Sequence, residues 1–356
     1  MIAFAEYIWL DGTTPTQTLR SKTRIVELST DCPKPADFPQ WSFDGSSTGQ
    51  AEGSNSDCAL LPVCIAKDPN RSCNDYLVLC EVYETNGALH DTNTRAKLRH
   101  ALRKDTDRLE AWIGFEQEYT LFQDGRPLGF PKAGFPEPQG RYYCGVGADR
   151  AFGRHIAEAH AQSCVEAGLI YYGLNAEVMP GQWEFQVGYR GIAGEDVTLI
   201  NICDHLWIAR YLLQRVAENH NIVVSFDNKP VKGDWNGAGL HTNFSTNATR
   251  GANGLAAIND AIEKLRERHA DHIVVYGDRL EERLTGSHET CAFGEFRSGN
   301  ADRGASIRIP PGVERAGAGY FEDRRPGANA DPYHIAARLI ETVSGIDTAN
   351  ADQSAA

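Results

Sequence analysis

Short apolar runs dominate the first part of the chain. Between Tyr7 and about Tyr83, runs such as TRIVEL and YLVLCEV are separated by clusters of Pro, Gly, Asp and Ser. Such runs, bounded by turn-forming residues, are typical of β-strands, and the helical period is weak in this region. The pattern therefore predicts a small β-rich domain at the start of the chain.

A different pattern begins after the turn-like stretch ETNGALHDTNT. RAKLRHALRKDTDRLEAW has apolar positions at helical spacing behind a Thr or Asn cap, which places a domain boundary near residues 84–94. Helical periods recur at 149–167, 196–219 and 255–269, among the strand candidates WIGFEQEYTLF, YGLNAEVM, QWEFQVG, LHTNFST, ASIRIP and YFEDR. Because the strands come in hairpin-like pairs rather than one per helix, the sequence predicts an α+β fold.

Composition and charge narrow the range of partners. The 356-residue chain is 41% hydrophobic and has a formal net charge of −13 without a Lys/Arg-rich run, which argues against a nucleic-acid partner. The start, MIAFAEYIWLDG, lacks a signal-peptide pattern, and no apolar run of about 18 residues is present to span a membrane. The nine cysteines form no C-x-x-C pair, so reduced thiols are a better interpretation than a zinc site. We expect a cytoplasmic protein with no membrane partner.

Carboxylates recur on the predicted strands at a spacing that puts them on one face. Side chains alternate along a strand, so Glu116 and Glu118 of FEQEY point the same way. In NAEVMPGQWEFQ, the central Met-Pro-Gly is typical of a turn, which brings Glu177 and Glu184 onto neighbouring strands. Like charges held this close repel one another, so a site that gathers them needs a cation.

Further polar side chains follow the same alternation. His241, Asn243 and Ser245 share one face of LHTNFS, and Glu322 and Arg324 share one face of YFEDRR. Arginines on such strands are the usual clamps for carboxylate and phosphate groups. Other charged candidates near these strands are Arg308 of ASIRIP, Arg303, and Arg283 with Glu289 just beyond it.

Each of these residues alone has a plainer interpretation. A pair of glutamates on a strand is more often a solvated sheet face, and a single histidine is more often structural. Their recurrence on several strands favours a shared Mg²⁺ or Mn²⁺ site over a zinc site, because oxygen ligands predominate. Neither G-x-x-x-x-G-K-[ST] nor a strand-linked G-x-G-x-x-G is present, so metals and arginines must hold any nucleotide. This combination points to phosphoryl transfer.

Several longer motifs resemble one family. WSFDGSSTGQ, EGSNSD, FEQEYTLF, PQGRYYCGVGADRAFGR, NAEVMPGQWEFQ, WNGAGLHTNFST, RLTGSHET, ASIRIP and GYFEDRRP together are similar to glutamine synthetase of the type II, eukaryote-like form, from about Tyr7 to about Pro332. The resemblance implies a β-grasp domain at residues 1–88. It also implies a catalytic domain at residues 89–356, with a curved antiparallel sheet and surrounding helices, and a decamer of two stacked pentamers.

The resemblance implies a reaction and its site residues. ATP would phosphorylate the side chain of L-glutamate to γ-glutamyl phosphate, and ammonia would displace the phosphate, with two or more Mg²⁺ or Mn²⁺ ions per active site. Glu118, Glu177 and Glu184 would hold one metal, and Glu116, His241 and Glu322 a second. The substrate ligands would be Arg283, Arg303 and Arg324 for glutamate and the transferring phosphate, Asn236 and Gly237 for the glutamate backbone, and Arg308, Arg250, Asn243 and Ser245 for ATP.

By the same resemblance, ammonium binds between subunits. Asp44 of the neighbouring subunit would take the proton of ammonium, with Tyr142, Ser47 and Glu289 nearby and Glu289 on a flap. Two alternatives remain. A related γ-glutamyl-amine ligase would differ at this pocket, and a catalytically silent family member would be expected to lose metal ligands. The retention of the ammonium pocket and of all six metal ligands favours the ammonia-using enzyme.

Overall fold

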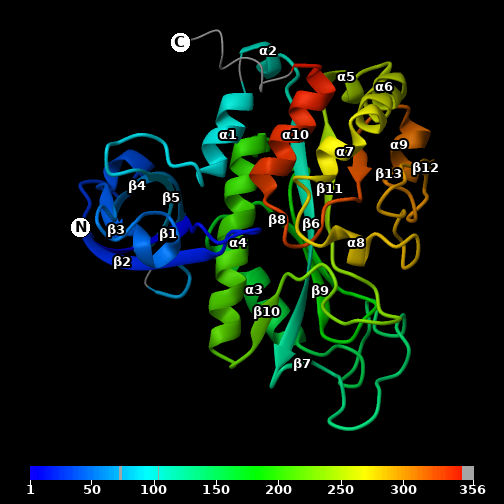
Figure 1. The fold of residues 1–356 in the computed structure, drawn as a ribbon, viewed down its shortest axis with the longest axis horizontal. Helices are drawn as coiled ribbons and strands as arrows, with labels where there is room; N and C mark the ends of the chain where they lie inside the picture. The colour runs from blue at the N-terminus through cyan, green and yellow to red at the C-terminus, as the bar shows by residue number, and fades with distance from the viewer. Residues whose placement is uncertain (72–73, 103, 347–356) are drawn as a thin grey trace.

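The first part of the chain forms a five-stranded sheet. The structure is a computed structural model that describes residues 1–71, 74–102 and 104–346. The strands are β1 (Ile2–Leu10), β2 (Leu19–Glu27), β3 (Trp41–Asp44), β4 (Asp57–Lys67) and β5 (Tyr76–Tyr83), in the order β2-β1-β5-β4-β3 (Figure 1). β1 and β5 are parallel, and the other pairs are antiparallel. Two short 3₁₀ helices, η1 (Pro35–Asp37) and η2 (Gly45–Thr48), flank β3.

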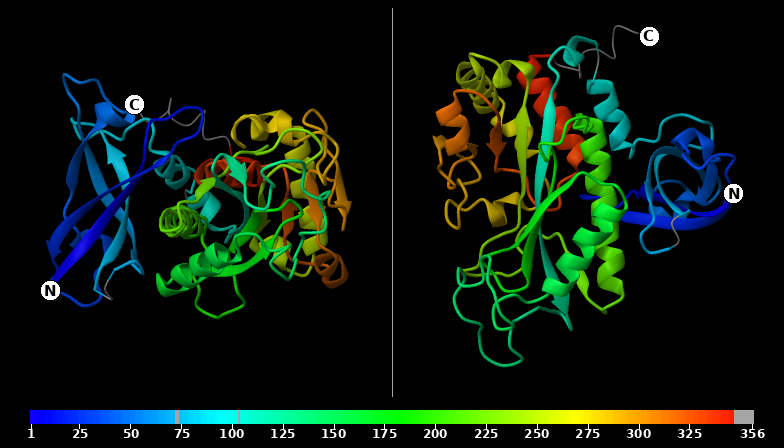
Figure 2. Two further views of the ribbon diagram at one scale, coloured as in Figure 1. Left: turned by 90° about the horizontal axis from the view of Figure 1, so that it is seen from below. Right: turned by 180° about the vertical axis from the view of Figure 1, so that it is seen from behind.

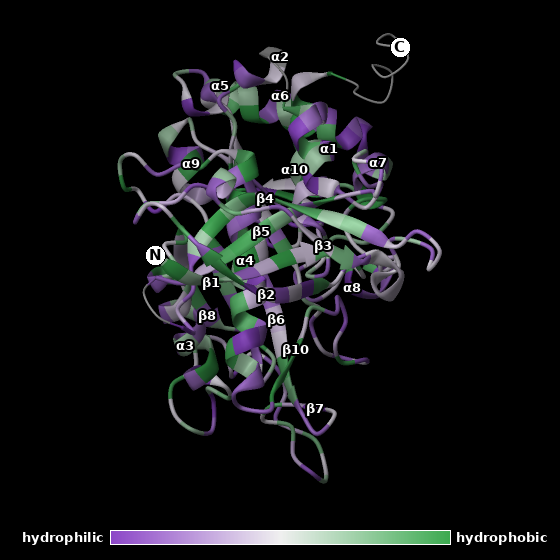
Figure 3. Cartoon of the chain, turned by 90° about the vertical axis from the view of Figure 1, so that its left-hand side faces the viewer, coloured by the Kyte–Doolittle hydropathy of each residue, from purple (hydrophilic) through white to green (hydrophobic). Residues whose placement is uncertain are grey.

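Both faces of this sheet carry apolar side chains into a core. Tyr7 and Trp9 of β1 belong to a cluster that also holds Phe43 of β3, and the rings of Trp9 and Phe43 lie 4.8 Å apart. Ile8 of β1 and Leu79 of β5 point to the other face and join the large core of the rest of the chain. The apolar colouring of β1 and β5 in Figure 3 reflects this two-sided burial.

Three helices lie between the first sheet and the second. They are α1 (Thr94–Ala101), α4 (Leu199–Glu218) and α10 (Pro332–Ser344), which stand between the two sheets in both Figure 1 and Figure 2. Asn93 caps α1 by accepting a hydrogen bond from the Ala96 amide. Asp331 caps α10 in the same way, and a proline follows it at the first helical position.

A buried charge network joins the first sheet to these helices. Arg95 of α1 donates to Glu81 of β5 at 3.0 Å and, from two nitrogens, to both oxygens of Asp204 on α4, at 2.8 and 2.9 Å. Tyr333 of α10 donates its hydroxyl to the same Asp204 at 2.5 Å. Removing Arg95 would leave the buried Asp204 without a charged partner, so this network ties the two parts of the chain together.

A nine-stranded sheet forms the centre of the larger part. Its main path runs β12-β13-β14-β11-β6-β9-β8, and β7 and β10 also pair with β6. The strands are β6 (Trp112–Gln123), β7 (Arg126–Pro127), β8 (Tyr171–Ala176), β9 (Gln182–Val187), β10 (Val223–Ser225), β11 (Leu240–Ser245), β12 (Ser298–Asn300), β13 (Ile307–Ile309) and β14 (Phe321–Asp323). β12 and β13 run parallel, while β6 is antiparallel to both β9 and β11.

The remaining α-helices of the described residues lie around this sheet. They are α2 (Lys104–Asp107), α3 (Arg154–Glu166), α5 (Asn247–Arg250), α6 (Gly254–Glu267), α7 (His269–Ile273), α8 (Leu280–Arg283) and α9 (Pro311–Ala316). No helix in the part of the chain that the structure describes is long and apolar enough to cross a membrane. The eight described cysteines are free thiols, and Cys73 lies outside the described residues.

The predicted α+β class and the main strands are confirmed, with differences at helix ends. The helix predicted over 149–167 begins only at Arg154, because Gly153 takes a left-handed conformation with φ of 86°. The pattern over residues 95–112 is not one helix. α1 ends at Ala101, and Trp112 already belongs to β6.

Candidate active site

The register of the second sheet brings the predicted carboxylates together. Glu118 of β6 lies opposite Glu184 of β9, and Glu116 of β6 lies opposite His241 of β11. β8 and β9 form the predicted hairpin, and the Glu177 amide, just past β8, donates to the Gln182 carbonyl. Period-two alternation therefore places these side chains on one face of the sheet.

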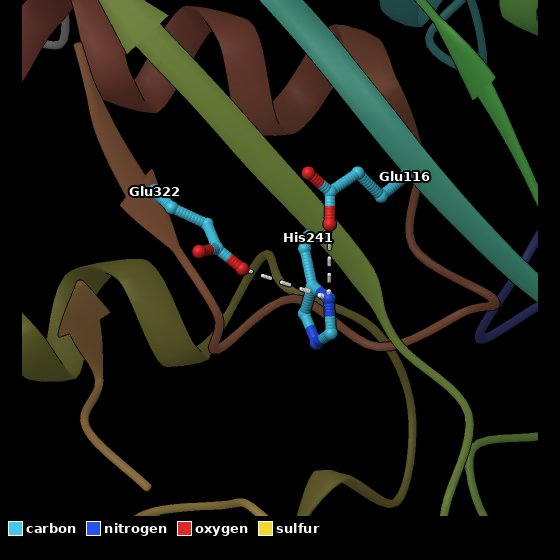
Figure 4. A group of neighbouring side chains, drawn as sticks. All are labelled: Glu116, His241 and Glu322. Atoms are coloured by element: carbon cyan, nitrogen blue, oxygen red, sulfur yellow. Dashed lines mark ion pairs between the residues drawn. The ribbon is translucent and has the colours of Figure 1, made fainter. Parts of the chain in front are cut away.

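Two groups of side chains have the geometry of metal sites. The ligand atoms of Glu116, His241 and Glu322 all lie within 4.8 Å of one another, and so do those of Glu118, Glu184 and His241. His241 Nδ1 is 3.5 Å from a Glu116 oxygen and 3.8 Å from a Glu322 oxygen (Figure 4). Carboxylate oxygens with one imidazole are a donor set that suits hard divalent cations.

The electrostatics of these groups favour the binding of a divalent cation. Burial, and then the neighbouring carboxylates, raise the pKa of Glu177 to about 8 and the pKa of Glu184 well above its ordinary value. Burial also raises the pKa of Glu118. Burial, with the nearby Arg324, holds the pKa of His241 well below its ordinary value, so the imidazole is neutral and able to bind a cation. A divalent ion would let the glutamates ionise together.

Arginines close the acidic cluster on its other side. Arg308 and Arg324 each donate to Glu322, at 2.5 Å in both cases. Arg283 lies 3.0 Å from His241 Nε2, so the Nδ1 atom is left facing the carboxylates. Positive groups beside a metal-binding face are suited to bind carboxylate or phosphate oxygens.

All of these residues except Glu322 line a cavity of about 480 Å³. The predicted site residues in its wall are Glu116, Glu118, Glu177, Glu184, Asn236, Gly237, His241, Arg283, Glu289, Arg303, Arg308 and Arg324. Glycine is required at Gly237, where a Cβ would lie 2.6 Å from the Asn228 carbonyl oxygen. At Gly239 a Cβ would lie 2.3 Å from an Arg283 nitrogen, so the small residues of WNGAG leave room for that guanidinium.

A second cavity of about 450 Å³ adjoins the first, and Glu116 and Gln186 line both. Its wall contains the predicted ATP-binding residues Asn243, Ser245 and Arg250, together with the aromatic residues Trp112, Phe115, Tyr172, Tyr189, Phe244 and Tyr320. Arg250 lies over the Trp112 ring at 4.0 Å and donates to Ser245 at 2.8 Å. Asn243 donates to Glu116 at 2.9 Å, which links the two cavities. An aromatic cleft beside an acidic one suits a nucleobase with its phosphates at the metals.

Four predicted residues do not line either cavity, and one of them is the metal-ligand candidate Glu322, which is buried beside Arg308 and Arg324. Asp44, the last residue of β3, and Ser47 of η2 are exposed, and Ser47 donates to Asp44 at 2.7 Å. Hydrogen bonds from Ser46 and Ser47 lower the pKa of Asp44 to about 2. Tyr142 is buried and donates its hydroxyl to the Glu137 carbonyl at 3.4 Å. Within one chain, the predicted ammonium pocket is therefore not assembled around the cavity.

Other residues in the walls were not predicted from the sequence. In the acidic cavity they include Gln139, Tyr143, Asn175, Gln186, His288 and Thr290. Gln186 follows Glu184 by two residues on β9 and donates to it at 2.7 Å, so strand alternation contains the signal for it. Gln139 and His288 lie in irregular loops, where no periodicity marks them.

The fold and the two cavities define a metal-dependent enzyme that acts on phosphorylated and carboxylate groups. Residues 1–85 match the family model described as the glutamine synthetase beta-Grasp domain, and residues 91–273 match the glutamine synthetase catalytic domain. The chain is 54% identical to glutamine synthetase of Streptomyces viridochromogenes over 95% of its length and 96% of the relative. It is 53% identical to that of Panulirus argus, over 95% and 92%, and 50% identical to that of Homo sapiens, over 95% and 89%.

The chain belongs to the glutamine synthetase family. It is a glutamate–ammonia ligase, so the activity predicted from the sequence is confirmed, as is the similarity to eukaryotic forms. The family uses ATP and divalent metal ions, and the two groups of glutamates around His241 are where this chain offers ligands for them.

Proposed function

We propose that the acidic cavity is where ATP phosphorylates glutamate and ammonia displaces the phosphate. The observation that carries this proposal is the convergence of His241 with glutamates of three other strand regions in one cavity walled by arginines. Glu118, Glu177 and Glu184 would hold one Mg²⁺ or Mn²⁺, and Glu116, His241 and Glu322 another. Bound there, the ions would neutralise phosphate charge during the transfer.

The side chains of this chain have separate tasks in the proposed reaction. Asn236 and Gly237 hold the backbone of glutamate, and Arg283 binds its carboxylate. An oxygen of the substrate's side-chain carboxylate forms a bond to the γ-phosphorus of ATP, and the bond from that phosphorus to the β–γ bridging oxygen breaks. Arg324 and Arg303 stabilise the charge on the transferred phosphoryl group, and Arg308 holds ATP phosphates. Arg250, Asn243 and Ser245 surround the rest of the nucleotide.

The second half of the reaction needs ammonia rather than ammonium. Asp44, held ionised by its serine neighbours, would take a proton from ammonium, with Tyr142, Ser47 and Glu289 around the cation. Ammonia then attacks the carbonyl carbon of the acyl phosphate, the bond from that carbon to the phosphate oxygen breaks, and the nitrogen gives up one proton to the departing phosphate. Because Asp44 lies on the first sheet and outside the cavity of its own chain, we propose that it serves the neighbouring subunit of a decamer of two pentameric rings.

The proposal extends to the organisation and location of the protein. Residues 1–88 form the β-grasp domain that presents Asp44, and residues 89–356 form the catalytic domain that holds glutamate, ATP and metals. We also propose a cytoplasmic location.

Phosphate release tests the proposed reaction. Wild-type protein should release phosphate from ATP only with glutamate present, and about one glutamine should form per phosphate when ammonium is added. Glu289→Ala should lose most glutamine formation, because Glu289 is proposed to shield the acyl phosphate and bind ammonium. Glutamate-independent release would reject the proposal, and faster turnover with a polyamine than with ammonium would point to a γ-glutamyl-amine ligase.

Arg250→Ala should weaken ATP binding selectively. The substitution removes the hydrogen bond to Ser245 and the cation over Trp112. We expect the KM for ATP to rise about tenfold, with the KM for glutamate changed less than about twofold, since the residue touches only the second cavity. Steady-state kinetics measure both, and Arg215→Ala, which removes a half-buried arginine of α4 that is paired with Glu218 and lies outside both cavities, is the control. Equal changes in both KM values would contradict the assignment.

A further inference from the structure

The loop that carries Glu289 is held in a strained conformation above the acidic cavity. Thr285 and Ala292 close its base as an isolated β-bridge. At its tip, His288 and Glu289 both adopt left-handed backbone angles, with φ of 53° and 60°. Two consecutive non-glycine residues in this region are unfavourable unless their surroundings hold them. The contacts of the tip therefore decide whether this conformation persists.

Gln139 contacts two loops. One is the tip that carries His288 and Glu289, and the other is the segment of residues 234–237, here called the glutamate-binding loop. Its side-chain nitrogen donates to His288 Nδ1 at 3.0 Å. Its side-chain oxygen accepts the backbone amide of Asn236 at 2.7 Å. Asn236 and Gly237 are the residues proposed to hold the substrate backbone, so one amide group joins that loop to the flap.

The second nitrogen of the imidazole completes the connection. His288 Nε2 lies 3.2 Å from a carboxylate oxygen of Asp234, which belongs to the same loop as Asn236. With Nδ1 accepting from Gln139, the proton resides on Nε2 and points to Asp234. The tip is thus tied twice to the loop of residues 234–236.

Gln139 is itself anchored to the metal-binding hairpin. The adjacent Gly140 amide donates to the Val178 carbonyl at 2.9 Å, one residue past Glu177. Gln139, Asn236, His288 and Glu289 all line the acidic cavity. The amide therefore sits where the glutamate-binding loop, the flap and the metal-binding hairpin meet.

We propose that Gln139, through His288, is a positioning residue that couples the glutamate-binding loop to closure of the Glu289 flap. This inference rests on the proposed function, because it needs an acyl phosphate to protect. When Asn236 is fixed by substrate, Gln139 is fixed with it and holds the tip over the cavity. Without that link the flap opens more often, and water replaces ammonia as the nucleophile on the acyl phosphate.

The test measures coupling as well as rate. Gln139→Met keeps the length of the side chain and removes both hydrogen bonds. We expect glutamine formation to fall about tenfold, while phosphate released per glutamine rises severalfold and the KM for ATP stays within about twofold. His288→Phe should give the same pattern with a loss at least as large, because it also removes the contact with Asp234. The double variant should be no worse than His288→Phe alone, because that variant already lacks the contact with Gln139.

Two further variants separate positioning from a loss of structure. Gln139→Glu keeps an acceptor for the Asn236 amide. Its carboxylate can also accept a hydrogen bond from His288 when Nδ1 carries the proton, so this variant should restore part of the coupling. Gln162→Met removes a glutamine of α3 whose side chain, among the described residues, donates to Glu166 at 2.8 Å and lies outside both cavities, and it should leave both ratios unchanged. Thermal melting that matches the wild type would show that the variants fold.

The outcomes distinguish this inference from the function on which it rests. If wild-type protein does not couple phosphate release to glutamate and ammonium, the proposed function fails. If wild-type protein is coupled and Gln139→Met retains the wild-type phosphate-to-glutamine ratio, the function stands and the coupling role of Gln139 is rejected. An additive loss in the double variant would also reject it.

Discussion

Glu184→Gln is expected to reduce glutamine formation about a thousandfold while leaving the metal-free protein at least as stable as the wild type. Glu184 is buried beside Glu116, Glu118 and Glu177. Burial first, and then these neighbouring carboxylates, raise its pKa well above the ordinary value. The amide removes one ionisable ligand but retains an oxygen that can accept from Gln186, as Glu184 does at 2.7 Å. We therefore expect catalytic activity to fall while the stability of the metal-free protein stays the same or increases.

Two measurements check this expectation. Titration calorimetry with Mn²⁺ should show an affinity about a hundredfold weaker than that of the wild type. Thermal melting in EDTA should give a midpoint equal to or above that of the wild type, because a buried carboxyl is no longer confined beside three others. Glu267→Gln, at an exposed position of α6, is the control. Wild-type turnover, or a clearly lower melting midpoint in EDTA, would show that Glu184 is a structural residue instead.

Mixing two inactive variants is expected to restore activity. Asp44→Ala should be nearly inactive, because the proposed base for ammonium is gone, and Glu184→Gln should be nearly inactive for a different reason. If Asp44 of one subunit completes the cavity of the next, a randomly reassembled one-to-one mixture contains intact sites at about one quarter of the interfaces. We therefore expect about a quarter of wild-type turnover, starting from two preparations that have almost none.

The mixing experiment needs dissociation and reassembly of the subunits. Activity is measured before and after dilution into mild denaturant followed by refolding, and each variant treated alone is the control. Asp44→Ala refolded with itself should remain inactive. A mixture no more active than its components, in assemblies shown by light scattering to contain both variants, would place Asp44 and Glu184 in the same subunit's site or remove Asp44 from the reaction.

The strands of the site were predictable because their pattern is simple. Alternation on β6, β9 and β11 fixed which face Glu118, Glu184 and His241 occupy, since a slip of one residue would turn apolar side chains such as Phe115 to the wrong side. The order in which these strands pair was not contained in that pattern. β8 pairs with β9 through a local turn, whereas β14 reaches β11 from far along the chain.

The loops of the site were the part that periodicity missed. Gln139 and His288 lie 149 residues apart in the chain and meet because their loops cross the same cavity. No hydrophobic period marks either residue, and left-handed backbone at His288 follows from tertiary contacts. The aromatic wall of the second cavity was missed for a similar reason, since Tyr189 and Tyr320 lie just outside β9 and β14.

The buried junction at Arg95 has a consequence for assembly. Its guanidinium holds carboxylates from both parts of the chain, Glu81 and Asp204, and so fixes the angle between the sheet that presents Asp44 and the cavity of the same chain. If Asp44 serves the next subunit of a closed ring, as proposed, this angle sets how far each subunit is rotated relative to its neighbour. We therefore expect the curvature of such a ring, and the number of subunits in it, to depend on this internal angle as well as on the surfaces where subunits touch.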